Sequence, residues 1–237
     1  MNYVFLRIYS TRGLYLGALF GGLVNSSATI AELGARLRQA GLVSRATALC
    51  LLTTIAMFAR NLILATIFSP RSLSGTLLPL LAMTTVAGFW VWRDHRIQDS
   101  LPGTLTLTSP ISLPKVIWFG TLFIAIQILG SLLTRFFGSY GMLATGIFGG
   151  LVSSASTTAA AATMAMHGKI SPSLAGSTAV LTSLTSAAVN LPIVWRTTRD
   201  KGVMRKLTFE MATVIATGIA AVTVDRVFQF SELLVRK

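Results

Sequence analysis

Seven stretches of the chain are long enough to cross a membrane as helices and carry few or no formal charges. These stretches are residues 13–31, 46–68, 72–92, 116–134, 136–168, 170–195 and 207–230. The hydrocarbon core of a bilayer needs about 20 apolar residues per helix, and the alternation typical of a membrane β-barrel is absent. The sequence therefore predicts an all-α, polytopic membrane bundle of about seven spans.

The composition excludes several other classes of protein. Apolar residues make up 53% of the 237 residues and charged residues 11%, against about 25% charged in an ordinary soluble domain. Such hydrophobicity excludes intrinsic disorder. The 20 Lys and Arg exceed the 7 Asp and Glu, but they are scattered singly, so we expect the lipid bilayer and not nucleic acid as partner.

The chain is predicted to contain an internal duplication. Residues 18–31 read ALFGGLVNSSATIA and residues 146–159 read GIFGGLVSSASTTA, with eight of fourteen positions identical at a shift of 128. Weaker blocks follow in the same order, including Asn61-Leu62 against Asn190-Leu191 at a shift of 129. Duplicated halves are frequent in transporter folds, although duplication can also serve packing alone.

The duplication defines the expected organisation. Residues 1–93 form the first repeat, 94–112 a polar linker, and 113–237 the second repeat. The second repeat opens with a complete span before its Gly-Gly motif, whereas only twelve residues precede Gly13, reaching about 18 Å as a helix. We therefore expect the first helix of the first repeat to be truncated or supplied by another chain.

Each copy of the Gly-Gly motif is followed by hydroxyl or amide side chains. Adjacent glycines weaken a helix by about 1 kcal/mol each relative to Ala, and Ser, Thr and Asn offer partners to freed backbone groups. This pattern favours a broken or re-entrant helix facing protein or water, which could bind a solute or ion; close helix packing through small residues is the alternative. The candidate path residues here are Gly21, Gly22, Asn25, Ser26, Thr29, Gly149, Gly150, Ser153, Ser154, Ser156 and Thr157.

Three further side chains complete the candidate site. Asn61 and Asn190 occupy matching positions late in the helix after each motif, where they can line a path or clamp helices together. Arg60 is an intramembrane charge, which favours a functional role, although it can also snorkel to an interface.

No motif of catalysis is present. The sequence contains no HExxH, nucleophile elbow or P-loop, and its single Cys50 excludes a cysteine-based zinc site. Seven acids, mostly near span ends, cannot build a Mg²⁺ cage from this chain alone. We therefore expect no enzyme activity, no cofactor and no metal.

The distribution of Lys and Arg along the chain discriminates between two membrane topologies. If both Gly-Gly elements cross the membrane fully, nine positive residues fall on each side. If both are re-entrant, twelve fall on one side and five on the other, with Arg7, Arg60 and Arg226 inside the membrane. The positive-inside rule favours re-entrant elements and hence inverted repeats.

Four short segments of the chain resemble a known family. They are GGLVNSSAT, GGLVSSASTTAAAA, Met57-Phe58-Ala59-Arg60-Asn61 and Val189-Asn190-Leu191-Pro192. This family is the domain of unknown function found C-terminal to the MgtC/SapB module in bacterial membrane proteins. The resemblance implies a multi-pass protein of the bacterial inner membrane. It names no substrate, and Ser153, Ser154 and Ser156 stand where some relatives carry aspartates.

Two functions follow as expectations. The first is a transporter-like or channel-like bundle for a small solute or ion, whose two motifs meet near the midplane. The second is a non-transporting module that binds or regulates another membrane protein. As partners beyond lipid, the sequence leaves open another membrane protein, an upstream helix or a second copy of the chain.

Overall fold

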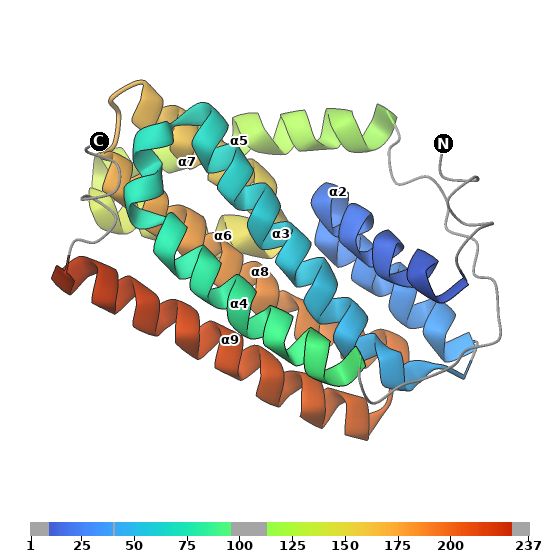
Figure 1. Ribbon diagram of the computed structural model, residues 1–237. Coiled ribbons are helices and arrows are strands. Elements are labelled where there is room, and N and C mark those ends of the chain that lie inside the picture. The colour runs from blue at the N-terminus through green and yellow to red at the C-terminus, as the bar shows by residue number, and fades with distance from the viewer. Residues whose placement is uncertain (1–9, 40, 96–112, 229–237) are drawn as a thin grey trace.

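A computed structural model describes residues 10–39, 41–95 and 113–228 (Figure 1). These residues are almost entirely helical and include no strand, which confirms the all-α prediction for this part of the chain. The helices are α2 (Ser10–Gln39), α3 (Ala46–Phe68), α4 (Leu77–His95), α5 (Leu113–Phe137), α6 (Ser139–Val152), α7 (Ser154–Met166), α8 (Pro172–Thr198) and α9 (Lys201–Phe228), with short 3-10 turns η1 (Val43–Arg45) and η2 (Pro70–Gly75).

Four helical segments are long and apolar enough to cross a membrane. They are Gly13–Gln39, Val43–Phe68, Pro172–Thr198 and Lys201–Asp225. Length and composition of this kind are those of a membrane protein. The sequence predicted about seven spans; beside these four, the described residues include two shorter apolar helical segments, Ile124–Phe137 and Ser139–Val152.

Two of the predicted elements are folded back on themselves. In α2, Asn25 has non-helical backbone angles (φ −154°, ψ 101°), and Ser153, between α6 and α7, has nearly the same angles (φ −160°, ψ 104°). Residues eight apart in a straight helix are separated by about 12 Å, yet Thr29 lies directly against Gly21 and Thr157 against Gly149. The chain therefore reverses at each break, and the two arms of α2 run side by side (Figure 1).

The long helices form an antiparallel bundle around which the two hairpins are arranged. Helices α3 and α9 run in one direction and α4 and α8 in the other (Figure 1). The α2 hairpin packs against α3 and α8, and the hairpin of α6 and α7 packs against α8, α3 and α5. The hairpins open toward opposite ends of the bundle, and their turns lie near its middle (Figure 1).

Local sequence accounts for the ends of these elements. Ser171 caps α8 by accepting a hydrogen bond from the Leu174 N–H, and Pro172 follows at the first helical position, where its missing N–H costs nothing. Gly168, with φ 71°, follows α7 in the left-handed conformation that favours glycine.

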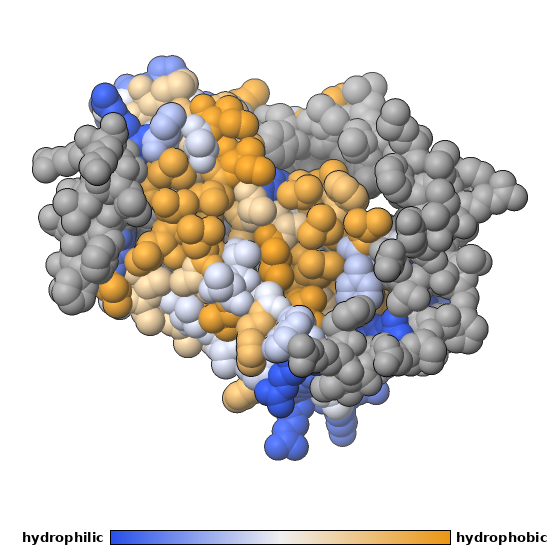
Figure 2. All heavy atoms as spheres, viewed as in Figure 1, coloured by the Kyte–Doolittle hydropathy of each residue, from blue (hydrophilic) through white to orange (hydrophobic). Residues whose placement is uncertain are grey.

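The surface agrees with a membrane location. Hydrophobic side chains dominate the middle of the face shown in Figure 2, and hydrophilic ones gather toward the ends. Helix α5 alone exposes Ile124, Ile128 and Phe136, at 57%, 58% and 74%. Apolar exposure on this scale is unusual for a soluble monomer and normal for helices in contact with lipid.

The predicted boundaries of the repeats fall close to helix ends. Helix α5 begins at Leu113, where the second repeat was expected to start, and α4 continues to His95, two residues past the predicted end of the first repeat. The rest of the predicted linker, residues 96–112, and the segment 1–9 of the predicted truncated helix lie outside the described residues.

Candidate functional site

The two helix breaks are built from the same contacts at equivalent positions. Asn25 Oδ1 accepts a hydrogen bond from the Ala28 N–H at 3.0 Å, and Ser153 Oγ accepts one from the Ser156 N–H at 3.3 Å. Each side chain thereby caps the helix that follows it. Thr29 donates to the Asn25 carbonyl at 2.8 Å, and Thr157 donates to the Ser153 carbonyl at 2.9 Å.

The paired glycines allow close approach of helices at both breaks. A methyl group added to Gly22 would lie 2.6 Å from the Thr53 carbonyl oxygen in α3, and one added to Gly150 would lie 2.7 Å from the Thr182 carbonyl oxygen in α8. Both distances are below van der Waals contact. The first glycine of each pair faces the Thr of its own hairpin. The first glycine therefore allows the two arms of the hairpin to pack closely, and the second allows the hairpin to pack closely against the neighbouring helix.

Arg60 brings the two breaks together. From the middle of α3, its Nη1 donates to the Val24 carbonyl oxygen at 3.0 Å, and its Nη2 donates to Ser154 Oγ at 3.0 Å. Val24 is the last residue before the first break, and Ser154 is the first residue after the second. One guanidinium therefore joins two segments 130 residues apart, and both breaks lie within its reach.

The site is accessible on one side and closed on the other. Arg60 is partly exposed, Asn25 is exposed, and Val24 is 39% exposed. Ser26, Ser154, Ser156 and Thr157 are buried, and Ser26 donates to Met57 Sδ at 3.4 Å. Only part of the predicted set of path residues therefore reaches the surface of this chain.

Asn61 and Asn190 form a second pair of equivalent contacts, between α3 and α8. Asn61 Nδ2 donates to Ser183 Oγ at 2.9 Å, and Asn190 Nδ2 donates to Thr54 Oγ1 at 3.2 Å. Both asparagines are fully buried, and the Oδ1 atom of each makes no hydrogen bond with the described residues. These amides hold the two central helices together, as interhelical hydrogen bonds do in membrane bundles.

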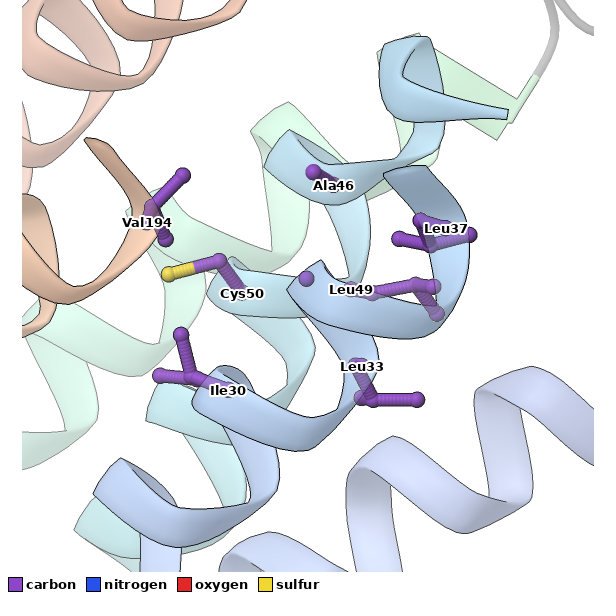
Figure 3. Close-up of a pocket in the computed structure, with 8 residues that line it drawn as sticks. Ile30, Leu33, Leu37, Ala46, Leu49, Cys50 and Val194 are labelled. Carbon is purple, nitrogen blue, oxygen red and sulfur yellow. The ribbon is translucent and has the colours of Figure 1, made fainter. Parts of the chain in front are cut away.

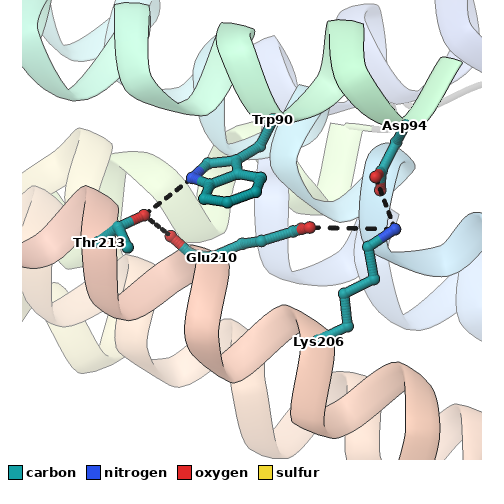
Figure 4. Close-up of polar contacts among 5 residues, drawn as sticks. All are labelled: Trp90, Asp94, Lys206, Glu210 and Thr213. Carbon is teal, nitrogen blue, oxygen red and sulfur yellow. Dashed lines mark hydrogen bonds and ion pairs between the residues drawn. The ribbon is translucent and has the colours of Figure 1, made fainter. Parts of the chain in front are cut away.

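Sequence reasoning missed a charged cluster between α4 and α9 (Figure 4). Lys206 Nζ lies 2.6 Å from Asp94 Oδ1 and 3.9 Å from Glu210 Oε1. Both carboxylates are buried, and Trp90 Nε1 donates to Thr213 Oγ1 beside them at 2.9 Å. In the sequence, Glu210 is an isolated acid in an apolar stretch, and this was the feature that could have indicated the cluster. Asp94 lies at the start of the predicted linker and was not expected to face a helix.

A small apolar cavity lies apart from this site, between the second arm of α2, the start of α3 and the end of α8 (Figure 3). Its lining includes Ile30, Leu49, Cys50 and Val194 and contains no charged side chain. Such a lining has no group that orients a polar ligand, and Cys50 behaves there as a small buried hydrophobe. Across the described ranges, no three His, Cys, Asp or Glu side chains gather as a metal site would require.

Comparison with known proteins gives a family and no activity. No curated protein and no solved structure matches the chain. The family model of a domain of unknown function, DUF4010, matches residues 1–198, which include both hairpins, Arg60 and both buried asparagines. The chain therefore belongs to the DUF4010 family.

Proposed function

We propose that this chain is a transporter-like or channel-like protein of the bacterial inner membrane, in which a small solute or ion passes between the two hairpins. In this proposal α3, α4, α5, α8 and α9 cross the membrane, and the hairpins enter it from opposite sides as parts of two inverted repeats. Together these make the seven embedded elements expected from the sequence. The relation to MgtC/SapB proteins belongs to the same proposal, which assigns no catalytic step to the chain.

The observation that carries the proposal is the pair of hydrogen bonds from Arg60 to the two breaks. Transporters with inverted repeats bind their substrates near the midplane, where discontinuous helices meet. Here two discontinuous helices meet at one intramembrane charge, and charges at this depth mark substrate or ion pathways.

Exposure of the first break gives independent support. Val24 is 39% exposed and Asn25 is exposed, so the irregular backbone is reachable from outside the chain. Non-helical backbone at membrane depth is tolerated only where protein covers it or water fills a cavity beside it. A water-filled path along this break satisfies that requirement.

The same observation supports a second candidate, a module that does not transport. If another membrane protein covers Val24, Asn25 and Arg60, the break is shielded by protein instead of water. The two functions differ in a measurable way, because only a water-filled path leaves Asn25 open to water-soluble reagents in the isolated chain.

Reactivity of an introduced thiol tests the proposal. Asn25→Cys is placed at the break, and Ile63→Cys, at a position 53% exposed on α3, is the matched control. Cys50 is 2% exposed and contributes little background. With the purified chain in liposomes, we expect a charged, membrane-impermeant methanethiosulfonate to modify Asn25→Cys and to leave Ile63→Cys unmodified.

Osmotic swelling of the same liposomes, followed by light scattering, measures passage of small solutes and salts. We expect faster volume recovery than in protein-free liposomes, and loss of that difference once Asn25→Cys is modified. If Asn25→Cys is unreactive and the liposomes swell no faster than protein-free liposomes, the transport function is refuted. The non-transporting module is then the function that remains.

A further inference from the structure

Arg60 carries a full positive charge that no described group neutralises. It is the one formal charge between residues 46 and 68, and its two hydrogen bonds go to a carbonyl and a hydroxyl, both neutral. Glu32 pairs with Arg36, and Asp94 and Glu210 lie beside Lys206. A charge in an apolar segment without a counter-charge is costly.

The helix ends around Arg60 do not cancel this charge. Each break contributes the negative C-terminal pole of one arm and the positive N-terminal pole of the next, equivalent to about half a charge each. The Val24 carbonyl at one negative pole already accepts from Arg60. Because two poles of each sign meet here, they offset one another, and the guanidinium sets the net charge of the site at about +1.

Arg60 also retains donors that are not in use. A guanidinium has five N–H groups in a planar fork, and the described contacts use two of them. Its Nε is buried and makes no hydrogen bond within the described part of the chain. The side chain is partly exposed beside Val24 and Asn25, so a small ligand can reach it.

The two breaks differ in how they use an arginine. At the shift of 129 that relates Asn61 to Asn190, the residue equivalent to Arg60 is Val189. Ser153 nevertheless adopts backbone angles within 6° of those of Asn25. Arg60 reaches the second break only at the Ser154 hydroxyl, and position 189 has no arginine to bind the Val152 carbonyl, so this turn does not require a guanidinium on the carbonyl that precedes it.

We propose that Arg60 and the N-terminal turn of α7 bind a small monovalent anion of the chloride or nitrate kind, an inference that rests on the transport function proposed above. One monovalent anion neutralises the charge of Arg60. The anion takes the free donors of the guanidinium. The first two backbone N–H groups of α7, which have no intrahelical acceptor, offer further donors, as helix N-termini do for anions, whereas the Ser156 N–H already donates to Ser153 Oγ.

Two measurements on the full chain test the inference. The first is thermal stability in detergent with sodium chloride or sodium nitrate against sodium gluconate at equal ionic strength. The second is chloride efflux from liposomes, with valinomycin and potassium compensating charge. The variants are Arg60→Gln, which removes the charge, Arg60→Lys, which keeps the charge without the fork, and Arg71→Gln, an exposed arginine in η2, as the matched control.

We expect chloride and nitrate to raise the melting temperature of the natural chain above its value in gluconate, and Arg60→Gln to lose this difference. Chloride efflux should fall about ten- to a hundredfold in Arg60→Gln, as for loss of one charged hydrogen-bonding partner. Arg60→Lys should be intermediate in both measurements, and Arg71→Gln should match the natural chain.

Each other outcome has a definite meaning. Equal melting temperatures in all three salts, or an anion effect unchanged in Arg60→Gln, would overturn the anion site. Solute passage in the swelling assay, together with chloride efflux that Arg60→Gln does not change, would overturn it while transport stands. Anion stabilisation that depends on Arg60 without any flux would support the site and refute transport. If Arg60→Gln fails to fold, the salt dependence of the natural chain and of Arg60→Lys decides.

Discussion

Replacing Gly22 with Ala should destabilise the protein even though Ala is the better helix former. A Cβ at residue 22 would lie 2.6 Å from the Thr53 carbonyl oxygen, 2.9 Å from Ala56 Cβ and 3.0 Å from Thr53 Cα. Two of these atoms belong to the backbone of α3, which cannot move individually. The first arm of α2 and α3 must therefore separate.

The size of the effect follows from two opposing terms. Ala in place of Gly in a helix interior contributes up to about 1 kcal/mol, whereas overpacking a tight contact costs about 1–3 kcal/mol. With backbone atoms as neighbours the upper part of that range applies, so the net loss is about 1–2 kcal/mol. For a chain of this length each kcal/mol shifts the melting temperature by about 2–4 °C, which predicts a decrease of about 2–8 °C.

Gly88 in α4 supplies the matched control, because a Cβ there would meet nothing within 4 Å. Gly88→Ala should leave the melting temperature in detergent unchanged or raise it by up to about 4 °C. Opposite signs for the two substitutions are the expected result. A Gly22→Ala protein that melts at or above the temperature of the natural chain would show that the close approach of α2 and α3 does not constrain this position.

Three further sets of substitutions address the other contacts. Asn61→Leu and Asn190→Leu each remove one buried hydrogen bond between α3 and α8. Chemical denaturation in detergent should therefore show a similar decrease in the free energy of unfolding for both, about 1 kcal/mol. A decrease in only one of the two variants would contradict equivalent roles. Lys206→Met leaves the buried Asp94 without its cation; since Lys206 is 42% exposed, we expect a loss of about 1–2 kcal/mol, largely recovered by adding Asp94→Asn. Ser153→Ala removes the cap of α7 and should cost about 1 kcal/mol in thermal denaturation, whereas Ser153→Asn, which installs the capping residue of the other break, should cost much less.

The class of fold could be predicted from the sequence because hydropathy alone decides it. Apolar stretches with few or no charges place α3 and α8 to within three residues and α4 and α9 to within six. The Asn and Ser that follow the Gly-Gly pairs are the residues at which the chain leaves helical geometry. The sequence does not predict the direction in which each hairpin folds back. This direction depends on packing between arms, such as Gly21 on Thr29, which local composition does not encode.

The contacts of the site were less predictable than its members. The sequence pointed to Arg60, Asn61 and Asn190 without indicating that the arginine meets both breaks or that the asparagines pair with Ser183 and Thr54. Those pairings depend on how α3 and α8 are rotated about their axes. The ion pair of Asp94 with Lys206 was missed for the same reason, since 112 residues separate its members.

The unequal halves allow a sharper test of how the site works. If the repeats are equivalent, an arginine at position 189 should reach the Val152 carbonyl and Ser26 Oγ, because these correspond by the shift of 128 to the Val24 and Ser154 groups that Arg60 contacts. We therefore expect Arg60→Val to abolish the stabilisation by chloride, and Arg60→Val combined with Val189→Arg to restore it. Restoration would mean that one charge at either break is sufficient. If the double variant folds but responds to chloride no better than Arg60→Val alone, the two breaks are alike in backbone only, and the anion site depends on groups around Arg60, such as the N-terminal turn of α7, that the equivalent place around residue 189 does not provide.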